Sequence, residues 1–500
     1  MTKPVPRSRF LTKWNFGLLH TILGFRQNWA MRIFFSVLLS CAICETLLAQ
    51  LPGQLDRIVS AHGIPYQGIS ILVKELHKEE PVLSHNAEVP RNPASTIKLL
   101  TTWVALEVLG PTYRWPTEIY FLGEWDGRRL DGDLGIKGYG DPYLVTEEFW
   151  NLLRELRRNG LEEITGDLVI DDSFFARVQT NPRDFDGQPY RSYNVTPNAL
   201  LLNYQAVRFQ FRVHSNGREV LIASDPILDN LIIENSLELV NGACGGYQAG
   251  ISFDIRDPDF GKTAVFSGSF SEACAPYSLY RSVLRHDTYA HGLFSTLWRD
   301  LGGIYAGEVT SQKIEDRFTP ELVWQSRSLA EVIRSINKYS NNVMTRQLLL
   351  TLGAKENYVP ATHEGGVEVI RNFLIERGLD PLSLVIENGA GLSRDSRISA
   401  SLLSDILELA QTSPFGSEFM ASMSIGGLDG TTRGRFGPAQ EGRAHVKTGR
   451  LDNVAAISGY VHAANGKTYT VSAMVNATDA HRGPGVELLD ELIAWVYSLR

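Results

Sequence analysis

The sequence predicts a fold of the α/β (α+β) class, in which one discontinuous domain is interrupted by a large β-rich insertion. Three observations lead to this prediction. Apolar residues have helical spacing at both ends of the chain, the chain closes with a pair of strands, and the region 115–314 breaks into short β-branched and aromatic runs separated by Gly and Asp. Neither end alone has enough strands to close a core, so we expect the two ends to share one.

The region after residue 50 is expected to begin with a helix, a strand and a second helix. Apolar spacing at 55–59 predicts a short amphipathic helix, and the apolar run at 68–73 indicates a strand. A longer helix is predicted to begin near Ser95 and to end at Gly110, which Pro111 follows.

The last third of the chain is expected to be helical before it closes with a hairpin and a final helix. Two helices and two strands are predicted, in that order, at 329–336, 402–407, 454–464 and 467–475. The dipeptide Asn465-Gly466 joins the two strands and predicts a type I′ turn. The helix predicted at 486–496 has no basic amphipathic extension, so we expect it to pack on the core.

Residues 1–49 have the pattern of an export signal. An apolar run at 33–43 follows Arg32 and precedes the small residue Ala49, and this run is too short to span a bilayer. An ordinary buried helix is the alternative, but such a helix rarely lies at a terminus behind basic residues. Lipoprotein processing at Cys41 is a minor alternative. We therefore expect an exported, periplasmic protein with no stable membrane span after processing.

The expected regions are therefore a targeting segment at 1–49, a discontinuous catalytic domain at 50–114 and 315–500, and an insertion at 115–314 with an inner subdomain at about 205–278. Beyond the targeting segment the cysteines are Cys244 and Cys274. An even pair in an exported protein predicts one disulfide, which would add roughly 3 kcal/mol by closing a loop of about thirty residues. Two free buried thiols are the alternative.

The charge balance excludes some classes of partner. The chain has 48 Lys and Arg against 56 Asp and Glu, a net charge of −8, which argues against a broad nucleic-acid-binding surface. The acidic balance also argues against adsorption to an anionic membrane surface. No group of residues has metal-ligand spacing, and no complete P-loop or dinucleotide loop occurs, so we expect no metal ion and no organic cofactor.

Three short patterns carry the chemistry, and they occur in the order Ser95-Thr-Ile-Lys98, Ser340-Asn-Asn342 and Lys447-Thr448-Gly449. A serine three residues before a lysine lies one helical turn away, so the amine can reach the hydroxyl. A lysine acts as a base only when it is neutral, which requires burial or a neighbouring positive charge such as Lys447. Ser95 alone could be a plain helix cap. The first pattern opens a helix, the second joins two helices and the third begins a strand, which is the placement found in penicillin-recognising serine enzymes.

On these motifs the sequence resembles the D-alanyl-D-alanine carboxypeptidase/endopeptidases among the low-molecular-mass, class C penicillin-binding proteins. The resemblance covers about residues 50–500 and extends to further runs: Gly138-Tyr-Gly-Asp-Pro, Thr165-Gly-Asp-Leu-Val-Ile-Asp, Tyr339-Ser-Asn-Asn, Glu387-Asn-Gly-Ala-Gly-Leu-Ser-Arg and Gly427-Leu-Asp-Gly-Thr. It implies a transpeptidase domain like that of penicillin-binding proteins and serine β-lactamases. The long gap between the first two motifs matches the inserted domains of the family.

The resemblance implies a serine peptidase that acts on peptidoglycan stem peptides and is acylated by β-lactams. Ser95 would attack the carbonyl of the penultimate D-alanine, and Lys98 would take its proton. Ser340 would relay a proton to the leaving amine, and Asn342 would hydrogen-bond the substrate's amide.

The remaining roles implied by the resemblance concern substrate binding. Lys447 and Thr448 would bind the terminal carboxylate, and the backbone N–H groups of Ser95 and Arg450 would form the oxyanion hole. The substrate-binding residues are then Thr448, Gly449 and Arg450.

The sequence departs from the family at Arg450, because the family usually has Thr or Ser there. Two interpretations of Arg450 are open: its side chain binds the carboxylate itself, or it points to solvent. Thr345-Arg346 also replaces the Ala-Glu that commonly follows the second motif, which we interpret as a structural change. A DD-peptidase is the preferred function, and a serine β-lactamase or esterase and a catalytically idle wall-binding homologue are the alternatives.

Overall fold

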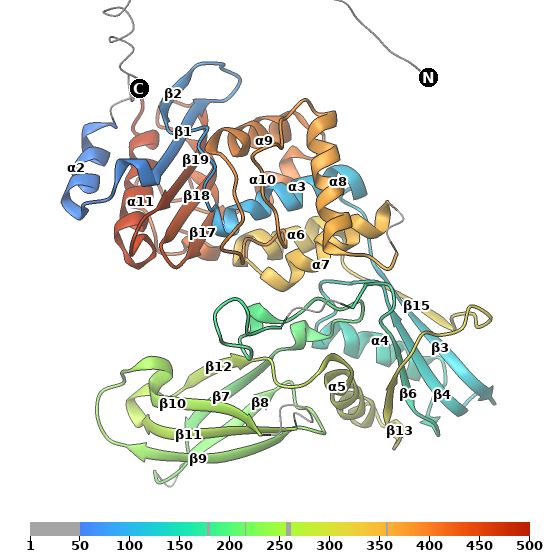
Figure 1. Ribbon diagram of the computed structural model, residues 1–500. Coiled ribbons are helices and arrows are strands. Elements are labelled where there is room, and N and C mark those ends of the chain that lie inside the picture. The colour runs from blue at the N-terminus through green and yellow to red at the C-terminus, as the bar shows by residue number, and fades with distance from the viewer. Residues whose placement is uncertain (1–50, 178–180, 216, 257–261, 357–358) are drawn as a thin grey trace, which may run out of the picture. The chain divides into compact units, whose positions relative to one another are not determined.

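The computed structural model describes residues 51–177, 181–215, 217–256, 262–356 and 359–500. Within this part of the chain, the two ends build one six-stranded antiparallel sheet (Figure 1). From one edge to the other its strands are β16 (Ser424–Ile425), β17 (Ala444–Leu451), β18 (Val454–His462), β19 (Thr468–Asn476), β1 (Ile69–Glu75) and β2 (Pro81–His85). Because β1 pairs with β19, the two ends share one core as predicted.

Helices cover both faces of this sheet. Ile71 and Val73 of β1 pack with α2 (Gly53–His62) and α11 (Pro484–Tyr497), whereas Leu72 packs in a second core with other helices. Successive side chains of a strand point to opposite faces, so the two cores lie on the two sides of the sheet. The helices that contribute to the second core are α3 (Lys98–Leu109), α6 (Leu329–Tyr339), α7 (Asn342–Lys355), α8 (His363–Glu376), α9 (Ala400–Thr412) and α10 (Gly416–Ser422).

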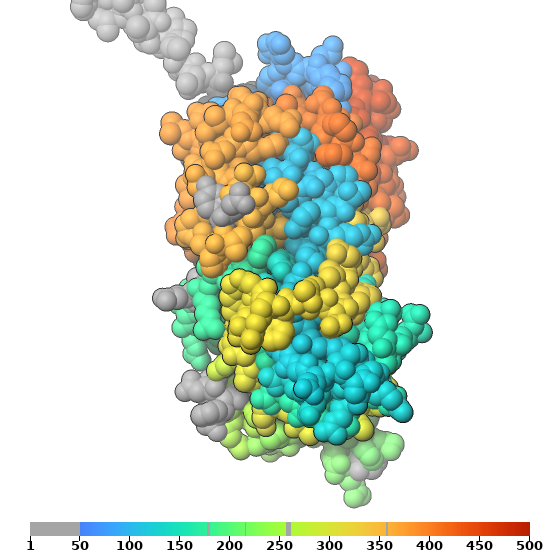
Figure 2. All heavy atoms as spheres, turned by 90° about the vertical axis from the view of Figure 1, so that its right-hand side faces the viewer, coloured from blue at the N-terminus to red at the C-terminus, as the bar shows by residue number. Residues whose placement is uncertain are grey.

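The middle of the chain contains a second sheet of seven strands. These strands are β3 (Pro116–Trp125), β4 (Arg129–Gly138), β5 (Glu163–Ile164), β6 (Leu168–Asp171), β13 (Ile304–Tyr305), β14 (Val309–Ser311) and β15 (Leu322–Gln325). Helices α4 (Thr146–Arg158) and α5 (His286–Asp300) share a core with this sheet. β15 pairs with β3, and the two segments lie against each other in the space-filling view (Figure 2). The sheet thus includes residues beyond 314, the expected end of the insertion. The sequence did not predict β15, because a strand of four residues is too short to show a period of two.

Two three-stranded sheets lie between β6 and α5 in the sequence. One consists of β12 (Tyr277–Arg281), β7 (Val207–Val213) and β8 (Val220–Asp225), and the other of β10 (Ile251–Arg256), β11 (Thr263–Ser271) and β9 (Ile232–Val240). Cys244 and Cys274 form a disulfide with their Cα atoms 4.8 Å apart, so the structure contains the predicted bridge.

The hairpin between β18 and β19 is present, but its turn differs from the prediction. A type I′ turn requires positive φ at both central residues, whereas Gly466 has φ +81° and Asn465 is not among the residues with positive φ. The N–H of Gly466 donates to the carbonyl of Ala463, and the N–H of Ala463 donates to the carbonyl of Lys467. These bonds fit a type I turn followed by a glycine bulge, which places only Gly466 in the left-handed region. The prediction of a type I′ turn was wrong for this reason.

The targeting segment predicted at 1–49 lies outside the described residues. Among those that are described, no helix is both long and apolar enough to cross a membrane.

Candidate active site

Ser95 and Lys98 lie at the start of the helix α3. Ser95 is in a short 3-10 turn, Ala94–Ile97, that leads directly into α3, and Ala94 before it has φ +45°. One turn separates the two side chains, and Lys98 Nζ lies 2.9 Å from Ser95 Oγ. The local geometry expected from the spacing is therefore present.

Lys98 is fully buried and has three oxygen neighbours. Besides Ser95, its amine donates to Asn342 Oδ1 at 2.7 Å and to the backbone carbonyl of Ala390. Burial lowers the pKa of Lys98 well below its usual value, and the positive charges of Lys447 and Arg346 lower it further. Both effects favour the neutral form of the amine.

Ser340 and Asn342 lie at the junction of two helices. Helix α6 ends at Tyr339, and Ser340 follows it in the left-handed region with φ +59°. Asn341 then caps α7 by accepting a hydrogen bond from the N–H of Met344. This sharp junction puts Ser340 beside Lys447 while Asn342 faces Lys98.

The third motif lies on β17, next to Ser95. Lys447 is fully buried, and its Nζ lies 2.9 Å from Ser340 Oγ and 2.6 Å from the carbonyl oxygen of Thr448. Burial lowers the pKa of Lys447 to about 7. A Cβ atom at Gly449 would lie 2.5 Å from the carbonyl oxygen of Pro93 and 3.0 Å from the N of Ser95, so only glycine allows this strand to approach the nucleophile so closely.

Thr448 of the third motif has a side-chain partner, whereas Arg450, which follows the motif, has none among the described residues. The hydroxyl of Thr448 donates to the hydroxyl of Thr431 at 2.7 Å. Arg450 is exposed, and its side chain forms no hydrogen bond or ion pair with the residues that the structure describes. Of the predicted site residues, the structure thus brings together Ser95, Lys98, Ser340, Asn342, Lys447, Thr448 and Gly449, and leaves the side chain of Arg450 without a protein partner in this region.

Three further residues were not assigned to the site from the sequence, and one of them, Arg346, was interpreted there as a structural change. Ala390 accepts from Lys98, and Thr431 contacts Thr448, although both lie in runs that the family resemblance had already singled out. Arg346 is buried and donates to the backbone carbonyls of Tyr193 and Val195, so it ties α7 to a segment of the insertion. A carbonyl or hydroxyl has no distinctive spacing in a sequence, which is why only the structure reveals these contacts.

Comparison with known proteins gives consistent matches over most of the chain. The family model for the D-Ala-D-Ala carboxypeptidase 3 (S13) family matches residues 51–493. A D-alanyl-D-alanine carboxypeptidase of Actinomadura sp. (strain R39) is 28% identical over 469 residues, which cover 89% of this chain and 84% of the relative.

Solved structures give matches of the same extent. Penicillin binding protein 4 from Haemophilus influenzae has a TM-score of 0.74 at 21% identity, over 89% of this chain and 99% of that chain. Its complex with a β-lactam has a TM-score of 0.70 at 21% identity and the same coverage. The predicted fold class, a transpeptidase-like α/β domain with β-rich inserted domains, is confirmed by this similarity and by the sheet topology. The chain belongs to the D-Ala-D-Ala carboxypeptidase 3 (S13) family and is a serine DD-peptidase, a hydrolase.

Proposed function

We propose that this enzyme acts on peptidoglycan stem peptides through an acyl-enzyme on Ser95. The observation that carries the proposal is the set of contacts of Lys98. Two of them, to Asn342 Oδ1 and to the carbonyl of Ala390, are to oxygens that only accept hydrogen bonds. These oxygens hold the two N–H groups of a neutral amine. The lone pair of the amine nitrogen then faces Ser95 Oγ, which lies 2.9 Å from Nζ, and points at the hydroxyl proton that must be removed.

The acylation step then follows from this arrangement. Ser95 Oγ attacks the carbonyl carbon of the penultimate D-alanine, and its proton passes to Lys98 Nζ. Collapse of the tetrahedral intermediate breaks the C–N bond, and the leaving amine receives a proton through the hydroxyl of Ser340. Lys447 Nζ, 2.9 Å from Ser340 Oγ, is placed to orient that hydroxyl. Water hydrolyses the ester in the second half of the reaction and restores Ser95.

Substrate binding is proposed to use the strand β17 and Asn342. The backbone N–H groups of Ser95 and Arg450 form the oxyanion hole, and each donor in comparable sites contributes about 3 to 4 kcal/mol. Lys447 and Thr448 bind the terminal carboxylate. The guanidinium of Arg450 is exposed, and its geometry suits a carboxylate. Asn342, whose Oδ1 is held by Lys98, keeps its amide N–H groups for the substrate.

Removal of the terminal D-alanine and cleavage of a cross-link are both proposed for this site. The two reactions share the acyl-enzyme and differ only in the leaving amine. The name of the Actinomadura relative supports the first reaction, and the β-lactam complex of the Haemophilus protein supports acylation by β-lactams. Export through residues 1–49 would bring the enzyme to this substrate.

The proposal is tested with purified stem peptides. Incubation with a pentapeptide that ends in D-Ala-D-Ala is expected to release one D-alanine, and a cross-linked dimer is expected to be split to monomers. Mass spectrometry of the products reports both reactions. A pentapeptide that ends in L-Ala is the control and is expected to remain intact. A folded protein that leaves both D-substrates intact would contradict the proposal.

Replacing Arg346 by glutamine is expected to move the acidic limb of the pH profile of acylation to higher pH. Burial lowers the pKa of Arg346 to about 10, so its guanidinium is charged at neutral pH, and this charge lowers the pKa of Lys98. Without the charge, the pKa of Lys98 rises, and a higher pH is needed to make the amine neutral. The rate constant of acylation by benzylpenicillin, measured across pH, reports the shift.

The matched control for this experiment is Arg346→Lys, which keeps the charge and loses the paired hydrogen bonds to Tyr193 and Val195. It is expected to keep the position of the acidic limb. An equal shift in both variants would mean that the contact with the insertion, and not the charge, tunes Lys98.

A further inference from the structure

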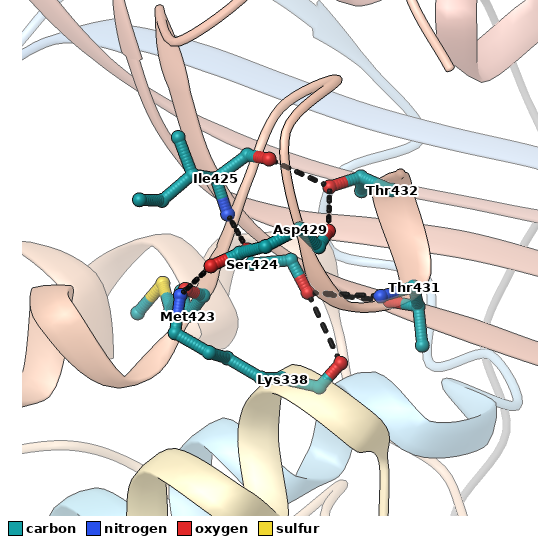
Figure 3. Close-up of polar contacts among 7 residues, drawn as sticks. All are labelled: Lys338, Met423, Ser424, Ile425, Asp429, Thr431 and Thr432. Atoms are coloured by element: carbon teal, nitrogen blue, oxygen red, sulfur yellow. Dashed lines mark hydrogen bonds and ion pairs between the residues drawn. The ribbon is translucent and has the colours of Figure 1, made fainter. Parts of the chain in front are cut away.

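The segment from Ser424 to Thr432, called the loop below, consists of the short strand β16 and the turn that follows it, and it is bound to the end of helix α6. Lys338 lies two residues before Ser340, is buried, and its Nζ donates to Asp429 Oδ2 at 2.6 Å and to the carbonyl of Met423 at 2.8 Å. The other carboxylate oxygen of Asp429 accepts from the N–H of Ile425 at 2.7 Å. Figure 3 shows these side chains gathered between the helix and the loop. The ion pair therefore fixes the loop to the element that carries Ser340.

The same loop brings Thr431 to the substrate-binding strand. The N–H of Thr431 donates to Ser424 Oγ at 3.2 Å, and Ser424 Oγ donates to the carbonyl of Lys338 at 3.3 Å (Figure 3). Gly430 has φ +56°, and a Cβ atom there would lie 2.3 Å from Ser424 Oγ and 2.6 Å from the carbonyl oxygen of Lys338. Glycine is thus required for the loop to close this tightly.

Three hydroxyls form a chain that ends on a backbone carbonyl. Thr448 donates to Thr431 at 2.7 Å, Thr431 and Ser424 are 3.4 Å apart, and Ser424 donates to the carbonyl of Lys338. Each hydroxyl has one proton and can also accept. In this arrangement the proton of Thr448 points toward Thr431 and is not available to a carboxylate. Thr448 can donate to a carboxylate only if its proton turns, and its oxygen can then accept a hydrogen bond from Thr431.

We propose that Thr431 is a positioning residue for the carboxylate-binding hydroxyl of Thr448, and that the Lys338–Asp429 pair holds it in place. When the substrate's carboxylate accepts from Thr448, the hydroxyl of Thr431 turns from Ser424 and donates to Thr448. The bond given up is the long one, at 3.4 Å, and the bond kept is the short one, at 2.7 Å. A hydroxyl that accepts one hydrogen bond while donating another is polarised and becomes a stronger donor.

The inference rests on the proposed role of Thr448 in binding the carboxylate. In it, the hydroxyl of Thr431 donates a hydrogen bond to the hydroxyl of Thr448. Position 450 has no hydroxyl in this chain, so Thr448 has no hydroxyl partner two residues along its own strand. Thr431 supplies that partner from a different segment. Its effect is therefore expected only for ligands with a carboxylate.

The test compares two acylating probes on Thr431→Val and Thr431→Ser. Benzylpenicillin has a carboxylate, whereas 4-nitrophenyl acetate has none. Both probes report acylation of Ser95 once the rate measured with the Ser95→Ala variant is subtracted. For Thr431→Val we expect the ratio of the penicillin rate constant to the ester rate constant to fall about five- to tenfold, the effect of a lost hydrogen bond between two neutral hydroxyls. Thr431→Ser, which keeps the hydroxyl, is expected to restore the ratio to within about threefold.

Each other outcome overturns the inference. An equal loss with both probes in Thr431→Val would mean that the residue only supports the fold of the site. A ratio in Thr431→Ser as low as in Thr431→Val would show that the hydroxyl is not the cause. The surface variant Thr412→Val is the matched control and is expected to leave both rates unchanged, because Thr412 is exposed at the end of α9. No penicillin adduct on the wild-type protein would overturn the proposed function, and this inference with it.

Discussion

Replacing Ser95 by alanine is expected to abolish the covalent adduct that the proposed function predicts with benzylpenicillin. The hydroxyl of Ser95 lies 2.9 Å from the buried amine of Lys98, whose pKa is lowered by burial. Ser340 also lies 2.9 Å from a buried lysine, Lys447, but its proposed role is to pass a proton to the leaving amine. Without the nucleophile no acyl-enzyme can form, and the proposed turnover of stem peptides is expected to fall by at least about 10⁴-fold. Intact-protein mass spectrometry, with and without the antibiotic, measures the adduct.

Two controls make this result specific. The thermal unfolding midpoint of Ser95→Ala is expected to match that of the wild type, since a small half-buried hydroxyl is removed. Ser60→Ala, on the exposed surface of α2, is expected to keep the adduct. An adduct that survives in Ser95→Ala at the wild-type rate would place the nucleophile elsewhere.

Replacing Lys98 by methionine is expected to slow acylation by about 10²- to 10⁴-fold, the usual contribution of a general base. Methionine has a similar length and no lone pair that could take the proton of Ser95. The loss is expected in the acylation rate constant, while the affinity of the initial complex with penicillin is kept, because Lys98 contacts Ser95, Asn342 and Ala390 rather than the carboxylate site. Stopped-flow or quenched-flow acylation at several penicillin concentrations separates the two quantities.

Lys98→Met is also expected to be less stable than the wild type, so its free energy of unfolding must be measured as well. It leaves Asn342 Oδ1 and the carbonyl of Ala390 without their donor, and each unsatisfied buried group costs about 1 to 3 kcal/mol. Lys78→Met, at an exposed turn position, is the matched control and is expected to affect neither rate nor stability. Wild-type acylation by a folded Lys98→Met protein would assign the base to another group.

Much of the fold could be predicted from the sequence because its signals are local. The helix α6 and the last helix α11 appear as apolar residues at helical spacing, and the strands β18 and β19 appear as apolar runs around a glycine-containing turn. The type of that turn was wrong, because the φ of Asn465 depends on how the two strands meet. β15 was missed because four residues contain too little pattern, and its place is set by its pairing with β3.

The candidate site residues also divide into contacts that the sequence predicts and contacts that only the folded chain forms. The sequence by itself determined the pairing of Ser95 with Lys98, since three residues of helix set that distance whatever surrounds it. It also supplied the order of the three motifs and, through them, the family. Only the tertiary structure decided that Asn342, which is 244 residues from Lys98 in the chain, accepts from its amine.

The tertiary structure also decided the electrostatics of the site. Burial of Lys98 and Lys447, which lowers both pKa values, results from the packing of two distant ends of the chain around one sheet. The contact of Thr431 with Thr448 likewise depends on a loop held by the pair Lys338–Asp429. Spacing in a sequence fixes geometry over a few residues, whereas desolvation and long-range hydrogen bonds exist only once the chain has packed.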